Sequence, residues 1–94
     1  MLPVYLSVKV RAKLEQLFPH EQRTSVAELL EAECGAGLPL IASQGAEGIE
    51  RIRCAVLKIS EGSLEKLHAA VQLANIDWRD VLVAAENRHR STPS

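Results

Sequence analysis

The sequence predicts an all-α fold, a compact bundle of about five short helices that forms a single domain over residues 1–94. Apolar residues make up 47% of the chain, yet tryptophan, tyrosine and phenylalanine occur only once each. The core must therefore be built from leucine, isoleucine, valine and alanine, which favours helix packing over an aromatic-rich sheet. Apolar side chains also recur at spacings of three and four residues, and capping residues separate these runs.

The first element allows two interpretations. As a strand, residues 4–10 alternate between apolar and other side chains with a period of two, and Val8 fits only this pattern. As a helix, the apolar positions follow at spacings of four, four and three, namely Leu6, Val10, Leu14 and Leu17. We favour a helix from about Val8 to Phe18 that ends against Pro19, with the residues before it extended.

The second helix is predicted to begin at Ser25, because Ser25 and Glu28 have the spacing of a capping box. It is expected to end at Gly35. Glu33 falls on the apolar face near the helix C-terminus, where a carboxylate opposes the helix dipole and needs a basic partner or solvent. The core face of this helix comprises Val26, Leu29 and Leu30.

Residues 35–48 contain four glycines and a proline, which predicts a long connection that Leu38, Leu40 and Ile41 hold against the core. A third helix is expected over 47–60, with a narrow apolar seam at Ile49, Ile52, Val56 and Ile59.

The last two helices are marked by their caps. Gly62 is expected to end the third helix and Ser63 to cap the fourth; Asn75 is expected to end the fourth in a left-handed conformation and Asp77 to cap the fifth. The tail, residues 88–94, is expected to fray. The predicted core comprises Leu14, Leu17, Leu29, Leu30, Ile52, Val56, Leu67, Val71, Trp78, Val81 and Leu82, with Trp78 as its largest contributor.

The net charge and the N-terminal sequence indicate no nucleic-acid partner, membrane or secretion signal. The net charge is −1, which gives no electrostatic footprint for nucleic acid or a membrane surface. No apolar run approaches the ~18 residues of a spanning helix, and the N-terminus lacks the pattern of a secretory signal. A cytoplasmic protein is expected, in which Cys34 and Cys54 remain reduced thiols.

No motif predicts catalysis, a cofactor or a metal site. Two E-x-x-H pairs occur, Glu65 with His68 and Glu86 with His89, but Glu65 points away from the core face of its helix and the second pair lies near a fraying end. Cys34 lies at a helix C-terminus, where a thiolate is disfavoured, and Cys54 faces away from the apolar seam. We therefore expect neither an enzyme nor a bound small molecule.

The favoured function is a non-catalytic helical module for protein–protein interaction or self-association, with a homodimer as one form. Leu57, Val83 and Leu73 lie off the apolar seams and suggest a second apolar surface, which either the first two helices cover or a partner contacts. Arg79 has no carboxylate one turn further along its helix and is free for a partner. The candidate contact residues are Leu57, His68, Arg79 and Val83.

The alternative is a DNA-binding dimer of ribbon-helix-helix type that uses residues 4–34. In this interpretation the strand over residues 4–10 pairs across the dimer, and Ser7, Lys9 and Arg11 reach the base edges. A helix through Val8 and Val10 excludes it.

The segment from Leu57 to Leu82 carries Leu57, Lys58, Ser60, Gly62 and Leu64, followed by Asp77 to Leu82. It resembles short uncharacterised bacterial proteins that share an L-K-x-S-x-G-x-L segment followed by D-[WY]-R-D-x-L. The resemblance implies a bacterial, intracellular origin and supplies no activity.

Overall fold

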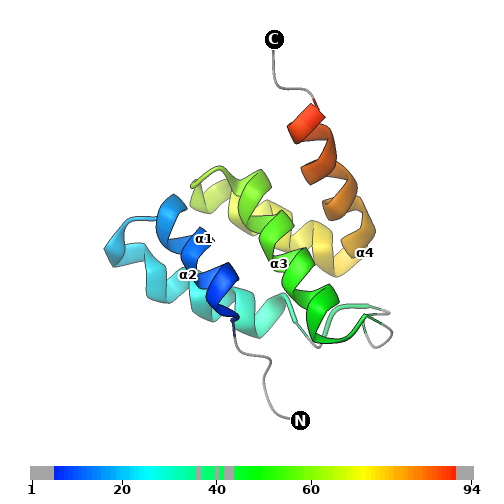
Figure 1. The fold of residues 1–94 in the computed structure, drawn as a ribbon, viewed down its shortest axis with the longest axis horizontal. Coiled ribbons are helices and arrows are strands. Elements are labelled where there is room, and N and C mark those ends of the chain that lie inside the picture. Colours follow the sequence, from blue (N-terminus) through cyan, green and yellow to red (C-terminus); the bar gives the residue numbers. More distant parts are fainter. Residues whose placement is uncertain (1–5, 36, 40, 42–43, 91–94) are drawn as a thin grey trace.

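The computed structural model describes residues 6–35, 37–39, 41 and 44–90. Residues 88–90 are described by their backbone alone. Over this part of the chain the fold contains four helices and no strand: α1 (Val8–Leu17), α2 (His20–Glu33), α3 (Gly45–Ser60) and α4 (Leu64–Arg90) (Figure 1). The all-α prediction is confirmed. The helix count differs because the fourth and fifth predicted helices are two parts of α4.

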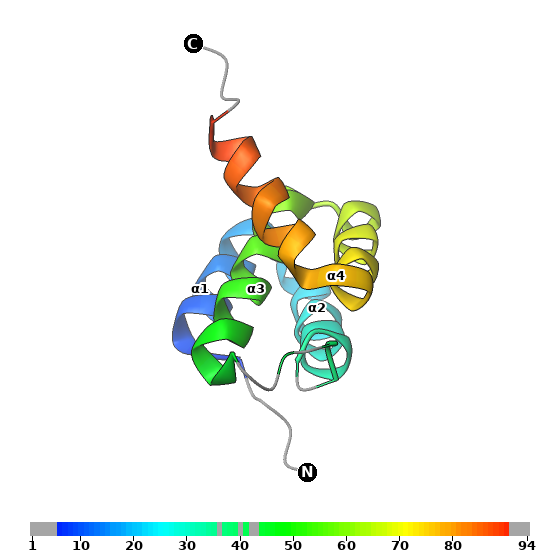
Figure 2. The same cartoon turned by 90° about the vertical axis from the view of Figure 1, so that its right-hand side faces the viewer.

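The helices form two layers. Figure 2 shows α1 beside α3 in one layer and α2 beside the first part of α4 in the other. Helix α3 contacts α1 on one side and α4 on another. It is therefore covered over much more of its circumference than a narrow seam would require.

Helix α1 begins where Ser7 caps it, since the Val10 amide donates to Ser7 Oγ at 3.2 Å. It ends at Leu17, one residue before the predicted Phe18, and Pro19 follows as expected. The favoured helix is confirmed, and the alternative strand is wrong for residues 8–10, which are helical; residues 4 and 5 lie outside the described part.

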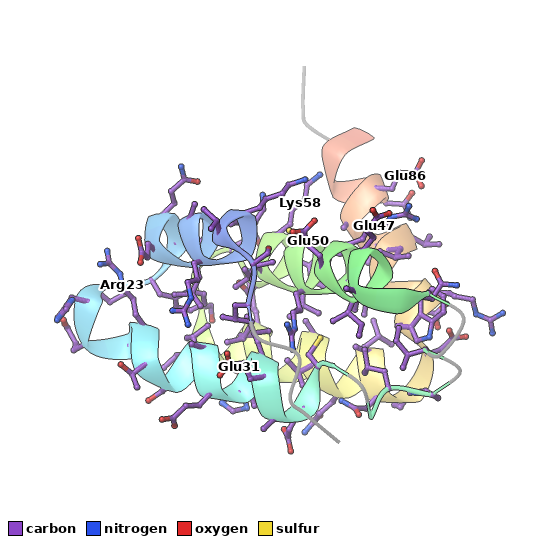
Figure 3. All side chains as sticks on the ribbon, turned by 60° about the horizontal axis from the view of Figure 1, so that its bottom comes forward. Arg23, Glu31, Glu47, Glu50, Lys58 and Glu86 are labelled. Carbon is purple, nitrogen blue, oxygen red and sulfur yellow. The ribbon has the colours of Figure 1, made fainter. Side chains whose placement is uncertain are left out.

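The predicted capping box of α2 is wrong, because the helix begins at His20 and Ser25 lies in its middle. Pro19 fixes an extended conformation at the N-cap, and the chain turns directly into helix there. Arg23 then reaches back to α1, donating from Nε to the Phe18 carbonyl at 3.1 Å and from Nη2 to the Glu15 carbonyl at 3.1 Å. Figure 3 shows Arg23 at this turn.

The turn between α3 and α4 matches the prediction. Glu61 and Gly62 both have positive φ angles, 53° and 80°, and the Lys66 amide donates to Ser63 Oγ at 3.3 Å. A Cβ atom on Gly62 would lie 2.7 Å from the backbone oxygen of Leu17, so the glycine also allows the turn to approach the end of α1.

Helix α4 bends at Asp77, whose φ of −158° and ψ of 101° are not helical. We call residues 64–76 the first arm and residues 78–90 the second arm. Asp77 caps the second arm as predicted, with Oδ1 accepting from the Arg79 amide at 3.0 Å. The predicted left-handed stop at Asn75 is wrong. Its φ is not positive, and its side-chain amide instead donates to the carbonyls of Glu33 and Val71, at 2.7 and 2.9 Å.

The core largely follows the predicted set. Trp78 is half-buried at its edge, and its Nε1 donates to the Pro39 carbonyl at 2.7 Å. Leu38 and Ile41 are buried as expected, and Leu40 lies outside the described residues. Of the other predicted core residues, Leu14, Leu30, Ile52, Val56, Leu67, Val71 and Val81 are buried and Leu17, Leu29 and Leu82 are half-buried.

Two predicted boundaries shift. Helix α3 begins at Gly45, so the connection after α2 is shorter than the predicted 35–48. The backbone of residues 88–90 continues α4, so this part of the predicted tail is helical, and residues 91–94 lie outside the described part.

Candidate functional site

An apolar groove lies between the two arms of α4, beside the last turn of α3. Its volume is about 280 Å³, and its walls are almost entirely hydrocarbon. The lining residues are Ile59, Lys66, Ala69, Ala70, Leu73 and Ala84.

Sequence spacing explains how the groove forms. Lys66, Ala69 and Leu73 follow one another at spacings of three and four, so they share one face of the first arm. The bend at Asp77 brings Ala84 of the second arm opposite this face. Short alanine side chains leave space between the arms, and the groove can accept apolar side chains from another molecule.

The charge of Lys66 is held at the rim of the groove. Its ammonium pairs with Glu61 at 3.0 Å, and both side chains are about half exposed, at 55% and 48%. The aliphatic stem of Lys66 is therefore left to line the groove, as long basic side chains commonly do on apolar surfaces.

Of the four predicted contact residues, Leu57 is wrong, because it is completely buried. A narrow apolar seam on α3 would leave Leu57 exposed, whereas helices pack on more than one side of α3. His68 and Val83 are exposed as expected, Val83 at 53%, but neither lines the groove.

Arg79 is exposed but is not free. It forms a two-pronged ion pair with Asp77, with Nε 3.0 Å from Oδ1 and Nη2 3.1 Å from Oδ2. A pair two residues apart does not form on a regular helix; here it forms because Asp77 is extended. The hydrogen bonds from Arg79 hold the pKa of the Asp77 carboxyl below its usual value, and the same contact raises the pKa of Arg79.

The DNA-binding alternative requires a strand over residues 4–10, but residues 8–10 are helical. Ser7 is occupied as the α1 cap, and Lys9 and Arg11 are exposed on a helix. Arg11 also lines a small cleft between α1 and α2 with a second arginine, Arg23, and with the carboxylates of Glu15, Glu28 and Glu31. The carboxylates outnumber the guanidinium groups in this cleft, which opposes phosphate binding.

A buried arginine is the feature that the sequence interpretation missed. Arg53 is 1% exposed, and its guanidinium donates to the carbonyls of Cys34, at 2.7 Å, and Leu30, at 3.3 Å. It thereby joins α3 to the C-terminus of α2, where the helix dipole favours a cation. A Cβ atom on Gly35 would lie 2.9 Å from its Nη2.

A sequence signal for this contact existed. Arg53 is four residues after Ile49 and three before Val56, so it occupies a position in the apolar seam of α3. A charged residue in a seam needs buried partners, and a glycine directly after a helix indicates a close approach.

The two cysteines are unpaired thiols with little nucleophilic character. Burial raises the pKa of Cys34 to about 11, against an opposing effect of Arg53. Burial also raises the pKa of Cys54, although Lys9 and Lys13 act in the other direction. Both thiols are therefore protonated at neutral pH, the opposite of an activated nucleophile.

Other candidate sites are weaker. A broad depression of about 660 Å³ lies where α2 meets the first arm of α4, but its walls mix polar and apolar groups. No group of three or more possible metal ligands occurs among the described side chains. Glu65, His68 and Glu86 are exposed, and the side chain of His89 lies outside the described part.

Within the described residues, no helix has the length and hydropathy required to cross a membrane. Comparisons with family models, curated proteins and solved structures each return no match for this chain. The resemblance of residues 57–82 to short bacterial proteins stays a prediction.

Proposed function

We propose that the chain is a non-catalytic protein–protein interaction module that holds a partner helix in the apolar groove. The observation that supports the proposal is the composition of the groove, whose walls are provided by alanine, leucine and isoleucine side chains and by the stem of Lys66. Amphipathic helices bind to such grooves through side chains spaced three and four residues apart.

The groove suits protein side chains better than a small molecule. Small-molecule sites combine apolar walls with a few convergent polar groups that fix the ligand. Among the described lining residues only Lys66 is charged, and it pairs with Glu61 outside the groove. At about 280 Å³ the groove can receive one or two leucine-sized side chains.

The partner helix belongs either to another protein or to a second copy of this chain. A cytoplasmic setting is part of the proposal, and the two unpaired thiols are compatible with it.

Site-specific photo-crosslinking in the cells that produce the protein tests the proposal. A photoreactive amino acid replaces Leu73, which lines the groove, or His68, which is exposed on the same arm outside it. We expect a discrete protein adduct from position 73 and none from position 68. The mass of the adduct distinguishes self-association from a different partner.

No adduct at position 73, or equal adducts at both positions, would contradict the use of the groove. A third variant at Val83 tests the other exposed apolar side chain of α4. An adduct at Val83 alone would move the interface to the outer face of the second arm and would likewise overturn the groove assignment.

A further inference from the structure

The bend in α4 rests on the Asp77 cap and on no proline or glycine. The 27 residues of α4 contain neither proline nor glycine, which are common causes of sharp helix kinks. Asp77 is extended, a conformation that any residue adopts without strain. The same residues are therefore compatible with one straight helix over 64–90.

The described contacts that hold the bend are hydrogen bonds of side chains near it. Asp77 pairs with Arg79 at the surface, where side-chain exposures of 32% and 67% make an ion pair weak. Asn75 donates to the Glu33 carbonyl, and Trp78 donates to the Pro39 carbonyl.

The second arm adds one apolar stripe to the core. Val81 and Ala85 are buried, and Trp78 and Leu82 are half-buried. Both ribbon views place this arm alongside α3, with its far end standing clear of the other helices (Figures 1 and 2). Figure 3 shows Glu86 pointing outward from it.

We propose that the second arm is exchanged between two copies of this chain. Helix α4 straightens at Asp77, and the stripe of each second arm packs on α3 of the other copy. The same apolar contacts then form between chains instead of within one, which is why domain swapping is a low-cost route to a dimer. The exchange uses the face of α3 beneath the arm, and it does not depend on the groove having a partner.

An exposed apolar residue at the bend indicates which additional contact the dimer would form. Ile76 is 76% exposed and immediately precedes Asp77. Because the exchange is reciprocal, a two-fold axis relates the two straightened hinges and brings the segments around Ile76 of both copies together. The closed monomer offers Ile76 no such cover.

Two substitutions at Asp77 test the role of the bend. Asp77→Ala removes the cap and favours continuous helix, whereas Asp77→Asn keeps a capping oxygen. After refolding at high protein concentration, sedimentation should show at least a tenfold larger dimer-to-monomer ratio for Asp77→Ala than for Asp77→Asn. A folded Asp77→Ala variant that stays monomeric overturns the proposal.

Proline at position 78 blocks straightening. It suits the first position of the second arm, and the ψ of 101° at Asp77 is close to what a residue before proline adopts, but a continuous helix cannot contain it. Asp77→Ala/Trp78→Pro should be monomeric, whereas the matched Asp77→Ala/Trp78→Ala variant should dimerise. Dimers of both double variants would mean association through another surface and would overturn the exchange.

A mixing experiment requires no proline variant. Tagged and untagged Asp77→Ala dimers are combined, and mixed dimers are counted by native mass spectrometry. An exchanged arm must detach before it changes partner, so mixed dimers should form only after brief exposure to unfolding conditions. Complete mixing within minutes under native conditions contradicts the exchange.

Discussion

Arg53 provides the most direct test of the fold, because one buried side chain joins α3 to the end of α2. Replacing it by methionine keeps the volume similar and removes the guanidinium. The Leu30 carbonyl retains the hydrogen bond from the Cys34 amide, at 3.0 Å, but the Cys34 carbonyl loses its 2.7 Å charged donor.

The expected loss can be estimated from these contacts. A charged hydrogen bond contributes roughly 1.5–3 kcal/mol, and an unsatisfied buried carbonyl costs about 1–3 kcal/mol. These two figures describe overlapping effects, so we expect Arg53→Met to lower the free energy of unfolding by about 3 kcal/mol. The loss for Arg53→Lys should lie between zero and the loss for Arg53→Met, since an ammonium cannot reproduce the planar guanidinium that donates to both carbonyls.

Urea denaturation monitored by circular dichroism measures the difference, and Arg51→Met is the matched control. Arg51 is exposed on the same helix, so its replacement should change stability by less than about 0.5 kcal/mol. A loss below about 1 kcal/mol for Arg53→Met would refute the reasoning, because buried polar groups that lose their donor cost more than that.

Three further predictions concern stability. Because burial raises the pKa of Cys34 to about 11, the thiol of the unfolded chain loses its proton first as the pH rises above about 9. The free energy of unfolding should therefore fall by roughly 1 kcal/mol per pH unit between pH 9 and 11, and this slope should be smaller in Cys34→Ala. Gly62→Ala should cost about 2 kcal/mol or more in urea titrations, against about 1 kcal/mol for Gly45→Ala, because both have positive φ but only position 62 meets a backbone oxygen. Trp78→Phe, which loses the bond to the Pro39 carbonyl, should lower stability by about 1 kcal/mol, and an unchanged urea midpoint would mean that this bond contributes nothing.

Features that depend on the local backbone were predicted from the sequence. Pro19 ends α1, Ser63 and Asp77 cap the arms of α4, and Gly62 adopts a positive φ, since each requirement lies within a few residues of the chain. The start of α2 was missed because Arg23 holds it through carbonyls of the preceding helix.

Features that depend on how the helices pack against one another were not predictable in the same way. Leu57 lies off the seam of α3, but packing on a second side buries it. Arg79 finds Asp77 because the chain leaves the helix between the arms, which spacing rules for a regular helix do not include. The groove follows from the same bend. Sequence spacing places Leu73 on one face of the first arm, but it cannot show that Ala84 of the second arm lies opposite that face.

The balance between a closed chain and an exchanged dimer depends on the few residues at the bend. Val81 and Ala85 are buried in the closed chain, and the proposed exchange keeps their contacts, so these contacts do not favour one form over the other. What differs lies at the bend: the Asp77 cap favours the closed chain, whereas a straight helix and cover for Ile76 favour the dimer. Because a surface cap and a single apolar side chain each contribute little to stability, one substitution at the bend is sufficient to change the dominant form.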